Sequence, residues 1–98
     1  MEKDLKEYVE RNIIPVYDMF DAGHGRNHAY AVIREALRLA GYYDVNSDMV
    51  YVAAAFHDTG LRVDRKTHHL ESGRIIREDR ALRRWFSEDE IEIIAQAA

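Results

Sequence analysis

The sequence contains no cysteine, a single proline and only five glycines among its 98 residues. Without cysteine, the chain has no disulfide framework, no thiolate zinc site and no cysteine nucleophile. No apolar run approaches the roughly 18 residues that a membrane-spanning helix needs. The first seven residues are charged and amphipathic, unlike a signal peptide. Because a lack of cysteine also fits a reducing compartment, we expect a cytoplasmic protein that does not enter a membrane.

The composition is that of one globular domain over residues 1–98, with 47% hydrophobic and 33% charged residues. A net charge of −4 argues against general binding of nucleic acids. The charge is unevenly distributed, however, because residues 62–84 hold eight basic side chains against four acidic ones. This stretch is either a solvated helix face or a site that receives an anionic small molecule.

The hydrophobic periodicity of the first 41 residues predicts two helices. Apolar side chains recur at helical spacing over residues 3–20, and Pro15 should kink this helix or split it near Asn12. A second apolar stripe predicts a helix over residues 27–40, which Gly41 would end.

A third helix is predicted from a short run that is apolar on every side, residues 49–56. So short an apolar run could also be a buried strand. Its three consecutive alanines, together with the capping side chains of Asn46, Ser47 and Asp48, favour a helix. We therefore expect this segment to be the central buried element of the fold.

The remainder of the chain predicts further helical segments. A charged loop leads to a helix over residues 68–78, with three residues on one face: His69, Gly73 and Ile76. Asp79 can cap a short apolar turn, and Ser87 begins a capping box for the last helix. That helix has no stop signal, so we expect the chain to be part of a longer domain. The fold class is all-α, with about five or six helices.

An imidazole and a carboxylate stand side by side where the third helix should end, as His57 and Asp58. Past a helix end both side chains can turn to one point, which neighbours inside a helix normally cannot do. His28 should point inward from the first turn of the second helix. Each histidine alone is more often a hydrogen-bonded core or loop residue. Together, two imidazoles and a carboxylate make a nitrogen–oxygen site suited to Mn, Fe, Ni, Co or Mg.

The residues around the pair extend this pattern. His57 and Asp58 follow the alanine-rich segment 53–56 and precede Gly60, while His28 stands on the preceding helix. This H…HD arrangement resembles the HD-domain superfamily of metal-dependent phosphohydrolases. Two more stretches agree: residues 23–28 (GHGRNH) are similar to the first motif of that family, and residues 68–73 (HHLESG) to the segment after its HD loop.

The resemblance covers about residues 21–98 and implies an HD-domain helical bundle. In this family the first histidine, the HD pair and a distant aspartate surround one metal. The resemblance therefore implies His28, His57 and Asp58 as ligands of a divalent ion, and Asp58 would also orient or deprotonate the attacking water. No later aspartate of the chain stands in the expected context. We therefore expect that this bundle lacks its C-terminal portion and has a more open metal site.

Further side chains gain roles from the same resemblance. Binuclear members of the family use additional histidines, which makes His69, or its neighbour His68, a candidate second-metal ligand or substrate contact. Basic side chains beside the ligands would hold substrate phosphates and neutralise developing charge. These are Arg62, Arg65 and Lys66 in the loop after the HD pair, and Arg26 near His28.

These features predict a metal-dependent phosphohydrolase acting on a phosphoester or phosphoanhydride, with a nucleotide as the substrate considered first. One alternative is a truncated or degenerate HD domain that binds a metal or nucleotide as a regulatory module without catalysis. Another is a helical interaction domain that binds no metal. Metal binding would exclude the plain interaction domain. Hydrolysis of a nucleotide would then distinguish the enzyme from the regulatory module.

Overall fold

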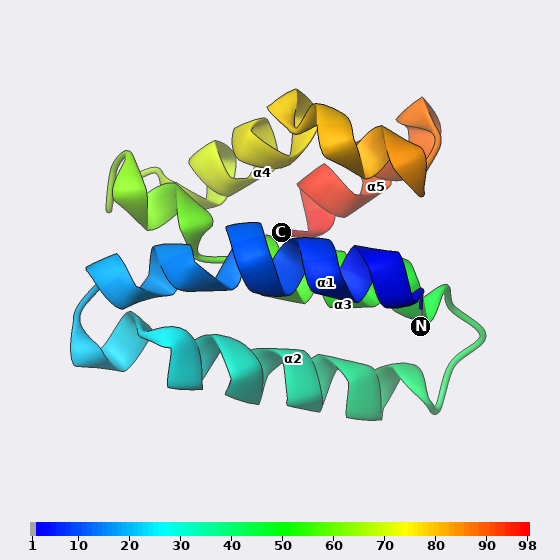
Figure 1. The fold of residues 1–98 in the computed structure, drawn as a ribbon, viewed down its shortest axis with the longest axis horizontal. Helices are drawn as coiled ribbons and strands as arrows, with labels where there is room; N and C mark the ends of the chain where they lie inside the picture. Colours follow the sequence, from blue (N-terminus) through cyan, green and yellow to red (C-terminus); the bar gives the residue numbers. More distant parts are fainter. Residues whose placement is uncertain (1) are drawn as a thin grey trace.

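A computed structural model describes residues 2–98 as a bundle of five α-helices, with no β-strand in that range (Figure 1). The α-helices are α1 (Lys3–Asn12), α2 (Arg26–Ala40), α3 (Ser47–Phe56), α4 (His68–Glu78) and α5 (Glu88–Ala97). Short 3₁₀ helices lie between them: η1 (Ile14–Met19), η2 (Ala22–His24), η3 (Thr59–Arg62) and η4 (Arg80–Arg84). The predicted all-α bundle is confirmed.

The first predicted helix is split in two, as the proline suggested. α1 ends at Asn12, and the chain continues as η1 with Pro15 in its first turn. Proline has no N–H to donate and its ring clashes with the preceding turn, so it is tolerated at the start of a helix and not in its interior. Tyr17 of η1 is fully buried, and its hydroxyl reaches the C-terminal end of α3.

α3 is the central helix and packs against both α2 and α5 (Figure 1). Asn46 caps it, because its Oδ1 accepts the backbone N–H groups of Asp48 at 2.9 Å and Met49 at 3.2 Å. The preference for a helix over a strand is therefore confirmed. Most of the segment expected to be the central buried element is buried, but Met49, Val50 and Ala53 are only half-buried where they line a groove between α2 and α5.

α4 packs against η3 and α5. Its predicted bounds are confirmed. Of the three residues predicted to share one face, Gly73 and Ile76 are buried whereas His69 is exposed. The buried residues are Ser72, Gly73 and Ile76. The polar Ser72 side chain can be buried because its hydroxyl forms hydrogen bonds with the backbone of the segment after α3.

The C-terminal third folds around its predicted caps. Asp79 accepts the backbone N–H of Ala81 at 3.0 Å, and Ser87 and Glu90 form the complete capping box of α5. All five α-helices contribute to one continuous hydrophobic core. Within residues 2–98, no helix combines the length and the hydropathy needed to cross a bilayer.

Candidate metal centre

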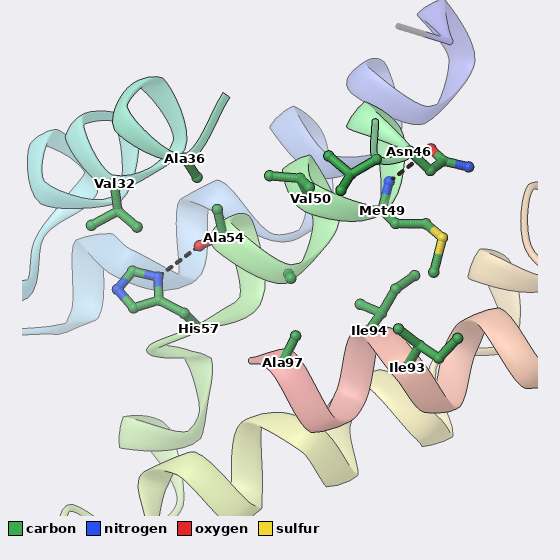
Figure 2. A pocket seen from close by; sticks show the side chains of 12 residues that line it. Val32, Ala36, Asn46, Met49, Val50, Ala54, His57, Ile93, Ile94 and Ala97 are labelled. Atoms are coloured by element: carbon green, nitrogen blue, oxygen red, sulfur yellow. Dashed lines mark hydrogen bonds between the residues drawn. The ribbon is translucent and has the colours of Figure 1, made fainter. Parts of the chain in front are cut away.

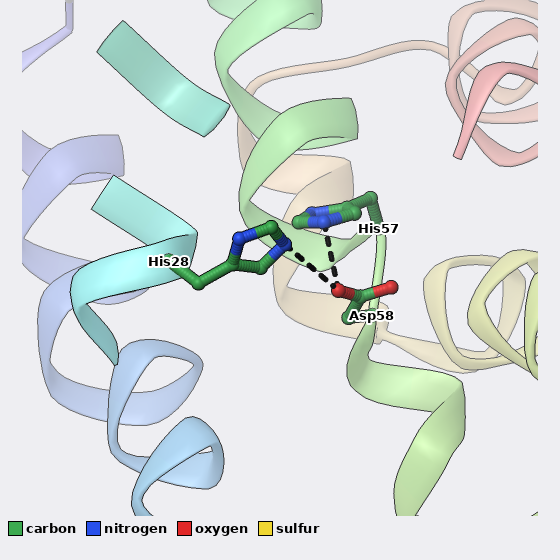
Figure 3. Close-up of side chains that lie close together, drawn as sticks. All are labelled: His28, His57 and Asp58. Atoms are coloured by element: carbon green, nitrogen blue, oxygen red, sulfur yellow. Dashed lines mark ion pairs between the residues drawn. The ribbon is translucent and has the colours of Figure 1, made fainter. Parts of the chain in front are cut away.

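The segment after α3 turns two polar side chains toward one point (Figure 3). We call residues 57–60 the HD turn. His57 still has helical dihedral angles, whereas Asp58 has φ −109° and ψ 6° and leaves the helix. The His57 Nε2 atom consequently lies 2.9 Å from Asp58 Oδ2, although the two residues are adjacent in sequence. Asp58 is only 7% exposed, so its carboxylate needs a partner within the protein.

His28 completes the cluster from the first turn of α2. Its Nε2 atom lies 3.4 Å from Asp58 Oδ2, and its ring centroid is 5.5 Å from that of His57. One donor atom from each of His28, His57 and Asp58 can be chosen so that all three lie within 4.8 Å of one another. The structure thus brings together the three residues that the sequence had suggested as metal ligands.

The hydrogen bond at the other ring nitrogen of His57 bears on whether a cation fits. Nδ1 lies 2.6 Å from the carbonyl oxygen of Ala54, and since a carbonyl only accepts, Nδ1 carries the proton (Figure 2). In the neutral ring, Nε2 then presents a lone pair to the Asp58 carboxylate, and two acceptors face each other. A second proton or a cation between them resolves this conflict. Metal-bound histidine rings usually donate their other N–H to a carbonyl or carboxylate, as the Nδ1–H of His57 does here. The nitrogen and oxygen atoms of this cluster are therefore suitable ligands for a divalent ion.

His68 shows the same arrangement at the start of α4. Its Nδ1 lies 3.0 Å from the carbonyl oxygen of Arg65, and its Nε2 lies 3.6 Å from Asp58 Oδ1. The exposed His69 instead lies against the ring of His68, with centroids 3.9 Å apart. Of the two histidines weighed as additional ligands, His68 is the one that approaches Asp58.

Side chains satisfy the backbone carbonyls at the C-terminal end of α3. The last carbonyls of a helix have no partner within it, and a buried one that stays unpaired is costly. Four successive carbonyls, those of residues 54–57, each accept a hydrogen bond from a side chain. The His57 ring donates to the carbonyl of residue 54. The hydroxyls of Tyr17, Thr59 and Ser72 donate to the carbonyls of residues 55, 56 and 57, respectively.

Two of these donors, Tyr17 and Ser72, were missed as site residues by sequence reasoning. Tyr17 was only one position in an apolar stripe, and Ser72 only part of the HHLESG stretch. Neither pattern indicates which backbone atoms a hydroxyl will meet. Burial raises the pKa of the Tyr17 hydroxyl, so it keeps its proton and remains a donor.

The four basic residues predicted as phosphate contacts fall into two groups. The Arg26 guanidinium binds Asp18, with Nη2 2.6 Å from Oδ2, and this hydrogen bond lowers the pKa of Asp18. Arg65 pairs with Asp21, whose pKa is lowered by hydrogen bonds from His24 and then from Arg65.

The other two predicted phosphate contacts, Arg62 and Lys66, are exposed. Among residues 2–98, neither side chain forms an ion pair. They are therefore more available to an incoming anion than Arg26 and Arg65, which would first have to leave their carboxylates.

An apolar groove of about 570 Å³ extends from His57 along α3, between α2 and α5 (Figure 2). Its polar lining residues are His57 and Asn46, and the Oδ1 of Asn46 already caps α3. The apolar lining residues are Val32, Ala36, Val45, Met49, Val50, Ala53, Ala54, Ile93, Ile94 and Ala97. The groove thus offers an apolar surface beside the cluster and few hydrogen-bonding groups.

Comparison with known proteins gives one family. Residues 25–98 match the family model described as HD domain, a segment that contains His28, His57 and Asp58 and leaves out α1, η1 and η2 up to His24. No curated protein and no solved structure matches the chain.

Proposed function

The chain belongs to the HD domain family, and from this premise we propose that it is a metal-dependent phosphohydrolase that cleaves a phosphoester or phosphoanhydride. One observation carries the proposal: His28, His57 and Asp58 present donor atoms within 4.8 Å of one another. The hydrogen bond from His57 Nδ1 to Ala54 adds support, because it leaves Nε2 directed at the carboxylate. The proposed ligands are these three residues, and His68 is a further donor beside them.

A divalent ion held there would supply a bound water of lowered pKa and would polarise a phosphoryl oxygen. The two oxygens of Asp58 have different neighbours, since Oδ2 faces His28 and His57 whereas Oδ1 faces His68. We assign Oδ2 to the ligand set. Oδ1 would then be available to orient the attacking water and to accept its proton, with His68 beside it.

A phosphorylated small molecule is the proposed substrate, and a nucleotide is the one to test first. Its phosphate would be held by the exposed cations Arg62 and Lys66, which form no ion pair within residues 2–98. Arg65 and Arg26 would join them only by exchanging their aspartate partners for the phosphate. Such guanidinium and ammonium groups neutralise the charge that develops on the phosphoryl oxygens.

Titration of the purified protein with Mn²⁺, Co²⁺, Ni²⁺, Fe²⁺ and Mg²⁺ tests the metal site. Wild type should bind at least one of these ions, and His57→Ala should bind it much more weakly because it removes a proposed ligand. His69→Ala is the matched control, since it removes an exposed histidine that does not approach Asp58. Equal metal content in wild type and His57→Ala contradicts the proposal.

A second candidate function is a regulatory module that binds a metal or nucleotide without hydrolysing it. It is favoured by the presence of a single carboxylate, that of Asp58, in the ligand cluster formed by residues 2–98. A nucleotide panel with Mn²⁺ and Mg²⁺ separates the two functions. Phosphate release that disappears in His57→Ala supports the enzyme, whereas a metal-dependent thermal shift without phosphate release supports the binding module.

A further inference from the structure

Tyr17 holds the HD turn from the side of η1. Its hydroxyl donates to the carbonyl oxygen of Ala55 at 2.7 Å and accepts the backbone N–H of Asp58 at 3.2 Å. One side chain thus bridges the last turn of α3 and Asp58, the second residue after it, across His57. The Tyr17 and His57 rings also lie near each other, with centroids 6.3 Å apart.

Ser72 holds the same turn from the side of α4. Its Oγ donates to the carbonyl oxygen of His57 at 2.9 Å and accepts the backbone N–H of Gly60 at 2.9 Å. This hydroxyl therefore bridges the HD turn across Asp58 and Thr59. Tyr17 and Ser72 come from elements far apart in sequence, yet each uses one hydroxyl both as donor and as acceptor.

The two hydroxyls bind opposite ends of one peptide group, the one that joins His57 to Asp58. Tyr17 accepts the backbone N–H of Asp58, and Ser72 donates to the backbone carbonyl of His57. Both side chains have 0% exposure, so water has no access to replace their hydrogen bonds. The orientation of a peptide group sets the direction of the side chains on either side of it. These hydrogen bonds therefore influence where the His57 ring and the Asp58 carboxylate lie relative to each other.

We propose that Tyr17 and Ser72 are positioning residues of the metal centre, and that their hydroxyls set its affinity by holding His57 and Asp58 in ligating geometry. This inference rests on the proposed metal site. Groups that orient ligands are as much a part of a metal site as the ligands, and small displacements of ligands weaken binding. Tyr17 also lies before residue 25, outside the segment that matches the HD domain family.

The test compares Co²⁺ binding to wild type, Tyr17→Phe and Ser72→Ala. Each substitution removes a hydroxyl and keeps most of the side-chain volume. Calorimetry gives the dissociation constant, and the visible absorption of bound Co²⁺ reports the geometry of its ligands. We expect a loss of affinity of about 10- to 100-fold in each variant, the range found when groups that orient metal ligands are removed. The Co²⁺ spectrum should change as well, which a purely structural role would not cause.

Two control variants separate positioning from general destabilisation. Tyr51→Phe removes another largely buried tyrosine hydroxyl, one that has no hydrogen-bond partner among the described residues. Ile91→Val deletes a buried methyl group of α5 and weakens the core without touching the HD turn. Both should keep wild-type affinity and spectrum.

The outcomes are distinct. Tyr17→Phe and Ser72→Ala variants that retain wild-type circular dichroism, Co²⁺ affinity within twofold and an unchanged spectrum overturn the inference while leaving the metal site intact. A wild-type protein that binds no Co²⁺ or other divalent ion overturns the proposed function itself. If one variant does not fold, the other alone decides, because each hydroxyl makes its own two hydrogen bonds around the HD turn.

Discussion

Replacing Gly60 by alanine tests how closely α4 must approach the HD turn. A Cβ atom at this position would lie 2.0 Å from the carbonyl oxygen of His68 and 2.7 Å from the backbone nitrogen of Ser72. Both are backbone atoms, so no change of rotamer can relieve the contact. The φ angle of Gly60 is not positive, which means that space rather than backbone conformation requires glycine here.

The size of the effect follows from the shift that alanine would demand. Moving the His68 carbonyl from 2.0 Å to an ordinary contact of 3.4 Å displaces α4 from the turn by about 1.4 Å. Such a shift breaks the 2.9 Å bond from Gly60 N–H to Ser72 Oγ. Overpacking costs about 1–3 kcal/mol, and each lost hydrogen bond about 1 kcal/mol more. We therefore expect Gly60→Ala to lower the free energy of unfolding by about 2–4 kcal/mol, out of a total of about 5–15 kcal/mol.

Urea denaturation measures this loss, with Gly23→Ala as the matched control. At Gly23 a Cβ atom would meet Asp21 Oδ1 at 3.5 Å, an ordinary contact, so the change should stay within about 0.5 kcal/mol. Gly73→Ala should fall between the two, because its Cβ would lie 2.9 Å from the Ala95 carbonyl oxygen. A Gly60→Ala variant as stable as Gly23→Ala would refute the close approach of α4 to the turn.

Two further predictions concern the bundle. Asn46→Ala removes an acceptor of two N–H groups at the start of α3 and should cost about 1 kcal/mol in urea denaturation. The exposed Asn27→Ala is its control, and equal losses would contradict the capping role. Burial is the largest factor raising the pKa values of Tyr8, Tyr17 and Tyr51. Because the unfolded chain releases these protons first, the unfolding midpoint should be steady up to about pH 10 and fall above it. A midpoint that stays constant to about pH 11 would contradict this reasoning.

Local signals predicted most of the fold. Pro15 marked the break between α1 and η1, and the polar residues at 46–48 marked the start of α3. Ser87 and its capping box marked the start of α5. Each of these signals acts within a few residues of the chain, which is why a sequence pattern can reveal it.

The candidate site was only partly predictable. His28, His57 and Asp58 belong to a family pattern that can be read from the sequence, and the structure brings them together. The approach of His68 and the hydroxyl contacts of Tyr17 and Ser72 depend on how η1 and α4 pack against the HD turn. No local pattern encodes such packing.

The pairing of two basic residues also escaped prediction. Arg26 and Arg65 were expected as phosphate contacts, yet in the structure they bind Asp18 and Asp21. Those carboxylates lie 8 and 44 residues away along the chain. A count of charges within residues 62–84 cannot reveal that Arg65 pairs with a carboxylate outside that stretch, and it does not include Arg26 at all.

The position of the proposed ligands in the chain has a consequence for stability. His28 and Asp58 stand 30 positions apart, and the chain has no cysteine with which to join distant segments. An ion shared by these two residues would act as a removable cross-link between the start of α2 and the end of α3. By the chain-entropy relation used for disulfides, closing a loop of this length contributes at most about 3–4 kcal/mol. The rigidity of the bundle would then follow the supply of the ion, high when it is plentiful and low when a chelator removes it.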